Sequence, residues 1–168
     1  MKLEGYTIIV GDSVDTDTII PARYIHRSDP KWLAQHVFED TPEIREKISK
    51  SPKPVAIIAG KGFGYGSSRE HAVLALKAVG VSLIIAESFH RIFYRNAINN
   101  GLAAIEANIR GYVKEGDIVK VDLKEGIIVI PRTNKTIGFK PLPKKLLEIL
   151  EIGGLKQFLK KIASSEPR

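Results

Sequence analysis

Up to residue 106 the chain alternates between short apolar runs and segments in which apolar residues recur at helical spacing. Residues 54–59, 81–87 and 102–106 are runs rich in isoleucine, valine, leucine and alanine, and residues 4–10 alternate between polar and apolar positions. Such runs are typical of β-strands, and the 54–59 and 81–87 runs are apolar enough for burial on both faces. The pattern therefore predicts right-handed βαβ units.

Four segments between or beside these runs predict helices, at residues 29–37, 41–48, 67–80 and 89–99. Each has a residue at its start that commonly caps helices. Thr41 is expected to cap the second helix and Ser88 the fourth, while the cap of the third is either Ser67 or Ser68. In the fourth helix, Ile92 is expected to point inward.

After Ile109 the pattern changes. Three short segments predict antiparallel strands, at residues 116–123, 126–130 and 136–139. From Pro141 the spacing is helical, with a break at Gly153-Gly154 and a polar tail after Ala163. With 168 residues and 43% hydrophobic content, residues 1–168 are predicted to be a single α/β domain that combines βαβ units with antiparallel strands.

The segment after the 54–59 run has the most distinctive composition. Glycines alternate with other residues from Gly60 to Gly66, and Ser67-Ser68-Arg69-Glu70 follows. Ser67 and Glu70 match a capping box, which would be a purely structural role. Four alternate glycines instead favour close backbone approach, and Arg69 opposes the dipole of a helix start unless an anion lies between them. The segment thus predicts a carboxylate or phosphate site.

Nucleotide binding is the alternative from a different functional class. A P-loop is excluded, because no Gly-Lys-Ser/Thr follows the glycines. A dinucleotide fingerprint fits loosely, with Gly62, Gly64 and Ser67 in its glycine positions and Glu87 at the end of the next strand. A nucleotide-binding module therefore remains open at this point.

Three aspartates and a polar loop lie near the N-terminus. Asp12, Asp15 and Asp17 lack the glycine and the terminal glutamate of an EF-hand, so they are turn or cap residues unless they serve a site. Pro21 and Pro30 prevent regular structure between them. Residues 21–28 are therefore either a polar surface loop or a loop that covers a substrate.

The net charge and the amino-acid composition argue against several classes of function. The net charge of +7 is spread along the chain, which argues against nucleic-acid binding and suits an acidic small molecule. No apolar run approaches the ~20 residues of a membrane span, and residues 1–6 lack the apolar region of a signal peptide. A cytoplasmic protein without membrane contact is expected. The four histidines lack metal-ligand spacing, so no metal is assigned.

Three motifs resemble the small subunit of the aconitase-type dehydratases. Residues 64–72 resemble that family's active-site turn, residues 86–102 its next strand and helix, and residues 11–24 its N-terminal signature. The resemblance implies a swivelling β/β/α domain and a hydro-lyase. It implies that the substrate is a malate-like acid, with 2-isopropylmalate and 3-isopropylmalate (leucine biosynthesis) favoured over homoaconitate or methyl-substituted malates.

The resemblance also implies roles for individual residues. Ser67 matches the catalytic base and Asp17 an acid that orients catalytic groups. Substrate binding is expected from Gly66, Ser68, Arg69, Ile25, His26 and Arg27. Of these, Ile25 suits an apolar group, whereas His26 and Arg27 suit an additional carboxylate.

The same family uses an iron–sulfur cluster. Such clusters are held by cysteine thiolates, and this chain has no cysteine. The expected arrangement is a cluster held by a large partner subunit, none bound by this chain, and a heterodimer or heterotetramer.

Overall fold

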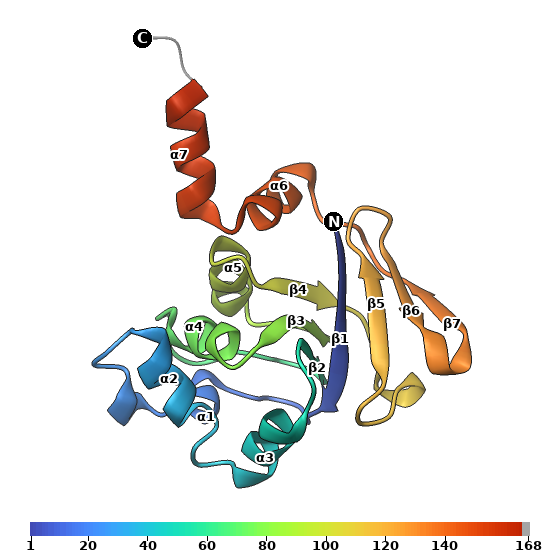
Figure 1. Cartoon of the computed structure of the whole chain (residues 1–168), viewed down its shortest axis with the longest axis horizontal. Coiled ribbons are helices and arrows are strands. Elements are labelled where there is room, and N and C mark those ends of the chain that lie inside the picture. Colours follow the sequence, from blue (N-terminus) through green and yellow to red (C-terminus); the bar gives the residue numbers. More distant parts are fainter. Residues whose placement is uncertain (166–168) are drawn as a thin grey trace.

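The computed structural model describes residues 1–165 and contains one seven-stranded mixed sheet (Figure 1). The strand order is β4-β3-β2-β1-β5-β6-β7. The first four strands along the chain are parallel to one another, and the last three continue the sheet antiparallel from β1. Their bounds are β1 Lys2–Ile9, β2 Val55–Ala59, β3 Val81–Ala86, β4 Ala103–Glu106, β5 Ile118–Asp122, β6 Ile127–Ile130 and β7 Lys135–Gly138.

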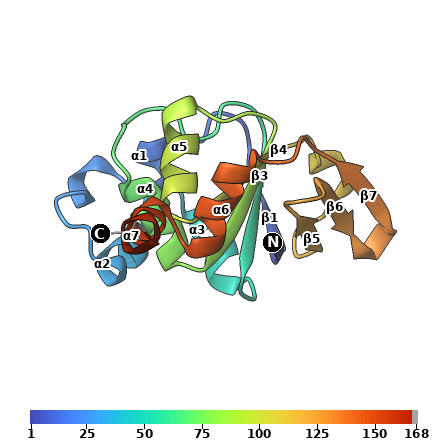
Figure 2. The same ribbon diagram turned by 90° about the horizontal axis from the view of Figure 1, so that it is seen from above.

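Helices connect the parallel strands and form the C-terminal end of the described chain. Their bounds are α1 Thr16–Ile19, α2 Pro30–His36, α3 Pro42–Lys50, α4 His71–Ala78, α5 Arg91–Asn99, α6 Lys144–Ile152 and α7 Leu155–Ser165. Short 3-10 turns are η1 Ala22–Tyr24, η2 Arg110–Tyr112 and η3 Pro131–Thr133. In Figure 2, β5, β6 and β7 lie together at one end of the molecule, away from α1, α2 and α4.

β2 is the centre of the fold because both of its faces are buried. Ile57 packs into the cluster that includes residues of α2 and α4, and Ile58 packs into the cluster that includes residues of α5, α6 and β5. Every residue of β2 is buried. Full burial of an isoleucine side chain stabilises a fold by about 1.5–3 kcal/mol, so a charged residue in β2 would destabilise the cluster that its side chain faces.

The antiparallel half of the sheet is covered on one face only. Along β5, Val119 and Val121 are buried, whereas Ile118 and Lys120, which alternate with them, are exposed. This alternation is the usual signature of a sheet with one solvated face. The observed mixture of βαβ units and antiparallel strands confirms the predicted α/β class. None of the helices in the described chain is long and apolar enough to span a bilayer.

Thr41 is the N-cap position of α3 and Pro42 its first residue, as predicted, although the Thr41 side chain makes no capping hydrogen bond. The predicted starts of the next two helices are wrong. The helix expected from Ser67 begins at His71, and the helix expected after Ser88 begins at Arg91. Ile92 is 41% exposed rather than buried, because Phe93, Ala97 and Ile98 form the inner face of α5. The last helix also continues beyond Ala163, to Ser165.

Candidate active site

Two loops that follow adjacent parallel strands enclose the candidate active site. β1 and β2 run in the same direction, so the residues after Ile9 and after Ala59 leave the sheet at the same edge. Residues 60–70 form the second loop, called the glycine turn below. A cavity of about 300 Å³ lies between them, a volume typical of small-molecule sites. Its lining residues are Asp15, Thr16, Asp17, Ile20, Ala22, Ile25, Tyr65, Gly66, Ser67, Arg69, His71 and Ala72.

The cavity brings together most of the predicted site residues from separate parts of the chain. Its lining includes Asp17, Ile25, Gly66, Ser67 and Arg69. The other predicted site residues lie outside the lining: Ser68, His26 and Arg27 are all exposed.

One side of the glycine turn is hydrogen-bonded to residues that follow β1. The Gly64 N–H donates to the Val14 carbonyl at 2.7 Å, and the Thr16 N–H donates to the Tyr65 carbonyl at 2.9 Å. The Ser67 N–H donates to Thr16 Oγ1, also at 2.9 Å. The path of the turn next to the cavity is therefore set by the segment that begins α1.

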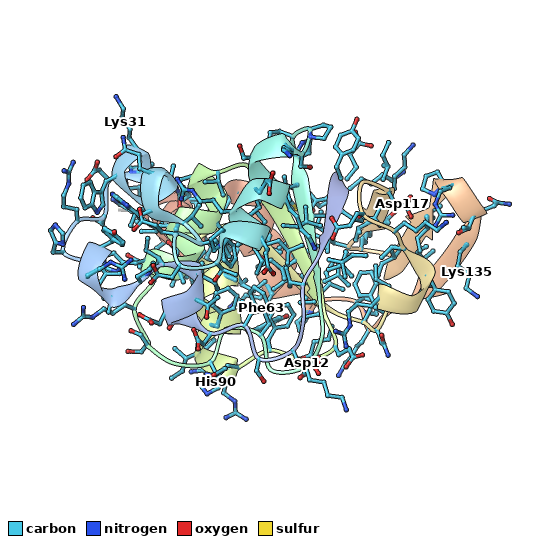
Figure 3. The ribbon with its side chains drawn as sticks, turned by 90° about the horizontal axis from the view of Figure 1, so that it is seen from below. Asp12, Lys31, Phe63, His90, Asp117 and Lys135 are labelled. Atoms are coloured by element: carbon cyan, nitrogen blue, oxygen red, sulfur yellow. The ribbon has the colours of Figure 1, made fainter. Side chains whose placement is uncertain are left out.

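The other side of the glycine turn is hydrogen-bonded to the loop between β3 and α5. The Phe63 N–H donates to the Ser88 carbonyl at 3.0 Å, and the His90 N–H donates to the Phe63 carbonyl at 2.9 Å. These hydrogen bonds join the backbones of Phe63 and the 88–90 segment, and Figure 3 labels Phe63 and His90. The Ser88 hydroxyl accepts from the Gly62 N–H at 2.9 Å. Ser88 therefore supports the glycine turn instead of capping α5.

Two glycines in the turn have no room for a side chain. Gly64 has φ +88°, and a Cβ there would lie 2.2 Å from Phe93 Cγ. Gly66 has φ +115°, and a Cβ there would lie 2.7 Å from Thr16 Oγ1. Positive φ disfavours any residue with a Cβ, so conformation and packing both select glycine at these positions.

Ser67 is not the helix cap that the capping-box pattern predicts. Since α4 begins at His71, the N-cap position belongs to Glu70, whose side chain makes no capping bond. The Glu70 carboxylate instead accepts from Asn100 Nδ2 at 3.1 Å. Ser67 Oγ accepts from the Arg69 N–H at 3.1 Å. A hydrogen bond donated to the oxygen favours its deprotonated form.

Only some N–H groups of the glycine turn are left to bind an anion. Several of them, including those of Gly62, Gly64 and Ser67, donate to neighbouring loops. Within residues 1–165, the N–H groups of Tyr65, Gly66, Ser68 and Glu70 have no hydrogen-bond partner. The unpaired donors therefore surround Ser67 and continue toward the start of α4.

Arg69 lines the cavity with an unpaired charge. Across the described residues, its guanidinium makes neither an ion pair nor a hydrogen bond. A guanidinium presents a planar fork of donors that matches a carboxylate. Arg69 and the neighbouring free N–H groups together form a site suited to an anion.

The two aspartates at the cavity hold its other wall in place. Asp15 caps α1 by accepting from the Thr18 N–H at 2.6 Å. A hydrogen bond between Asp15 and the Tyr65 hydroxyl raises the pKa of Tyr65. Asp17 accepts from the Ala22 N–H at 2.8 Å and so fixes the start of the next loop.

That next loop, residues 20–29, is called the η1 loop and is anchored on α2 and the residues after it. Arg23 forms hydrogen bonds of 2.8 and 2.5 Å to the Asp40 carboxylate. Trp32 Nε1 donates to the Tyr24 carbonyl at 2.8 Å. These contacts hold the loop beside the cavity without any ligand.

Arg27 and His26 of the η1 loop lie outside the cavity lining. Arg27 pairs with Asp29 at 2.9 Å and lies over the Trp32 ring, with 4.5 Å from Cζ to the ring centroid. His26 Nδ1 lies 3.1 Å from the Arg23 carbonyl. Only Ile25 of the predicted specificity residues faces the cavity.

A charged cluster supports the start of the glycine turn. Asp12 Oδ1 accepts from the Lys61 N–H at 2.9 Å and from Arg110 Nη2 at 3.1 Å. The Lys61 hydrogen bond is the main cause of a lowered pKa of Asp12, with a smaller contribution from Arg110. Glu87, the expected ribose ligand of a nucleotide site, lies 3.6 Å from Arg110 and is only 14% exposed. Glu87 is thus part of this cluster.

An iron–sulfur cluster does not fit the residues of this chain. The sequence contains no cysteine. In the part of the chain that the structure describes, no three His, Asp or Glu side chains converge to hold a metal ion. Thiolates for such a cluster have to come from another polypeptide.

Thr16, Tyr65 and His71 are among the lining residues that were not predicted from the sequence. Thr16 and Tyr65 flank predicted residues but carry no pattern that marks them, since their contacts join segments about fifty positions apart. His71 was excluded as a metal ligand and assigned no other role. Its Nδ1 is buried and has no partner among the described residues.

Comparison with known proteins agrees with this geometry. Residues 16–109 match the family described as Aconitase C-terminal domain. A 3-isopropylmalate dehydratase small subunit of Halothermothrix orenii is 51% identical over 162 residues, which cover 95% of this chain and 96% of that protein. The protein of that name from Saccharolobus islandicus is 51% identical over 164 residues, which cover 96% of each.

A solved structure is similar over almost the entire chain. It is a crystal structure of a 3-isopropylmalate dehydratase (leuD) from Methanocaldococcus jannaschii, with a TM-score of 0.88 and 46% identity. The match covers 98% of this chain and 96% of that one. The chain therefore belongs to the family of 3-isopropylmalate dehydratase small subunits, which are aconitase-type hydro-lyase subunits.

Proposed function

We propose that this chain, joined to a large subunit, interconverts 2-isopropylmalate and 3-isopropylmalate by dehydration and rehydration, a step of leucine biosynthesis. The names of its relatives support this substrate. The observation that carries the proposal is that one cavity is lined by Ser67, by Arg69 with no partner among the described residues, and by the apolar side chain of Ile25.

The cavity offers complementary surfaces for the two ends of such a substrate. Arg69 and the free N–H groups of Tyr65 and Gly66 bind a carboxylate. The apolar part of the lining, with Ile20, Ala22 and Ile25, accommodates an isopropyl group. Homoaconitate has a carboxylate at the corresponding place, and the nearest candidate cation, Arg27, is paired with Asp29. This arrangement supports the isopropyl substrate.

Ser67 is proposed to move the proton. Its Oγ takes the proton from the carbon next to the bound carboxylate, and the C–H electron pair passes into the developing enediolate. A serine hydroxyl is a poor base in water, so its deprotonated form must be stabilised. The Arg69 N–H donates to this oxygen, and the Arg69 charge lies in the same cavity. Both favour the alkoxide and the enediolate.

The large subunit is proposed to contribute the iron–sulfur cluster, in a cytoplasmic heterodimer or heterotetramer. In this arrangement the chain described here binds and orients the substrate and moves a proton. Asp17 is proposed to orient the catalytic groups, because it fixes the η1 loop at Ala22.

The test is to produce the chain together with the large subunit from the same genome and to assay isopropylmalate turnover. Ser67→Ala is expected to lower kcat by about 10²–10⁴-fold, the usual contribution of a general base. Ser51→Ala is the matched control, because its hydroxyl contacts only the adjacent Pro52 carbonyl. Full activity in Ser67→Ala, or in this chain alone, would contradict the proposal.

A further inference from the structure

We infer that Thr16 is a positioning residue for Ser67, with its hydroxyl acting as the acceptor that fixes the backbone of the proposed base. This inference rests on the proposed function of Ser67. Thr16 Oγ1 accepts from the Ser67 N–H at 2.9 Å across 51 positions of sequence. No other side chain of the described residues bonds to the backbone of Ser67.

Thr16 holds the glycine turn at two points on either side of Gly66. Its own N–H donates to the Tyr65 carbonyl at 2.9 Å, while its hydroxyl accepts from Ser67. The position that a Cβ of residue 66 would take lies 2.7 Å from Thr16 Oγ1. The threonine hydroxyl therefore occupies the space that glycine leaves open, and the two residues fit as a pair.

Thr16 is itself held firmly. It is only 6% exposed and begins α1, which Asp15 caps. Its carbonyl accepts from the Ile20 N–H at 2.9 Å. An acceptor that is itself fixed holds the Ser67 backbone in one position, whereas a water molecule in its place would not.

Loss of this acceptor is expected to affect the chemical step rather than substrate binding. Without it the Ser67 N–H would turn toward water, and Oγ would lose its defined position. A displacement of about 1 Å in a reacting group lowers rates by about 10²-fold. Arg69 and the apolar wall remain in place, so KM is expected to stay within about threefold.

A second buried threonine provides the matched control. Thr7 is 1% exposed, and its Oγ1 donates to the Lys114 carbonyl at 2.7 Å, outside the cavity lining. Thr7→Val and Thr16→Val each delete one buried hydroxyl with little change in shape. Both are expected to lower the melting temperature, but only Thr16→Val is expected to lower kcat.

The experiment measures kcat, KM and melting temperature of the reassembled enzyme for Thr16→Val, Thr16→Ser, Thr7→Val and Ser67→Ala. Thr16→Val is expected to lose about 10–100-fold in kcat, and Thr16→Ser, which keeps the hydroxyl, to recover to within about threefold of the original. Equal kcat in Thr16→Val and Thr7→Val would overturn the inference. So would a Thr16→Ser variant as slow as Thr16→Val.

Amide hydrogen exchange of the full chain gives a readout that does not require activity. The Ser67 N–H is expected to exchange at least about tenfold faster in Thr16→Val, while the Gly64 N–H, bonded to Val14, keeps its rate. Unchanged exchange at Ser67 would overturn the inference. If Ser67→Ala stays active, the proposed base fails, but this exchange experiment still decides whether Thr16 holds Ser67.

Discussion

The glycine turn and the η1 loop border the same cavity but differ in whether their charged groups are paired within the protein. In the η1 loop, Arg23 and Arg27 are paired with carboxylates. In the glycine turn, Arg69 and four backbone N–H groups have no partner among residues 1–165. The η1 loop is held by contacts within the protein, whereas the unpaired groups of the glycine turn are the ones proposed to bind the substrate. Whether a charged side chain is available to bind a ligand therefore depends on its partners within the protein as well as on its residue type.

Replacing arginines in the two loops gives the largest expected contrast. Arg69→Gln is expected to lower kcat/KM for isopropylmalate by about 10²–10³-fold, because the proposed role of this unpaired cation is to bind the substrate carboxylate. Arg27→Gln removes the exposed ion pair with Asp29 and is expected to change kcat/KM by less than about threefold. Steady-state kinetics of the reassembled enzyme measures both. An equal loss in the two variants would mean that Arg27 leaves Asp29 and binds substrate, as the family resemblance implies.

Gly66→Ala is expected to have the next largest effect. The added methyl group meets Thr16 Oγ1, and φ is +115°. Strain of this kind amounts to about 1–3 kcal/mol and is expected to reduce kcat by about 10–100-fold. Gly111→Ala is the control, because nothing lies within 4 Å of a Cβ there. If kinetics and thermal unfolding were the same for both variants, the fit between Gly66 and Thr16 would be disproved.

Ile25→Arg tests the apolar side of the cavity. Loss of contact with the isopropyl group is expected to lower kcat/KM for isopropylmalate by about 10–100-fold, the range for small apolar groups. Activity on homoaconitate is expected to rise relative to isopropylmalate. Competition between the two substrates measures this ratio, with Ile44→Arg on α3, outside the cavity lining, as the control. An unchanged ratio would exclude Ile25 as a specificity residue.

Acidification is expected to have the smallest effect, a loosening of the η1 loop alone. Hydrogen bonding to Arg23 lowers the pKa of Asp40, and hydrogen bonding to Arg27 lowers that of Asp29. When a carboxylate has a lower pKa in the folded than in the unfolded protein, it stabilises the fold at pH values above the unfolded-state pKa. This stabilisation is lost as the pH falls through the folded-state pKa. Below about pH 4 the loop is therefore expected to loosen.

Trp32 reports this change, because it is the only tryptophan of the chain and donates to the Tyr24 carbonyl. Its fluorescence is expected to shift between pH 7 and pH 3. In Asp40→Asn the shift is expected to be smaller, since one of the two pairs is already lost. An identical titration in both proteins would show that the pairs do not hold the loop.

The successes and errors of prediction have clear physical causes. The buried strands β2 and β3 were predicted closely, because a fully apolar run of this length has few alternatives. The start of α4 was missed by four residues, since Ser67 and Glu70 carry capping chemistry but bond to Arg69 and Asn100 instead. Ser88 was misassigned for the same reason, because it accepts from Gly62 in a distant segment.

By itself the sequence determined the order of strands and helices, the α/β class, the glycine-rich turn and the absence of thiols for a metal cluster. These properties depend on local periodicity and on composition, both of which are readable along the chain. The tertiary structure decided which charges are paired, which N–H groups stay free and that Thr16 supports Ser67. Those properties depend on contacts between segments far apart in sequence, and the register of β1 against β2 brings these segments together.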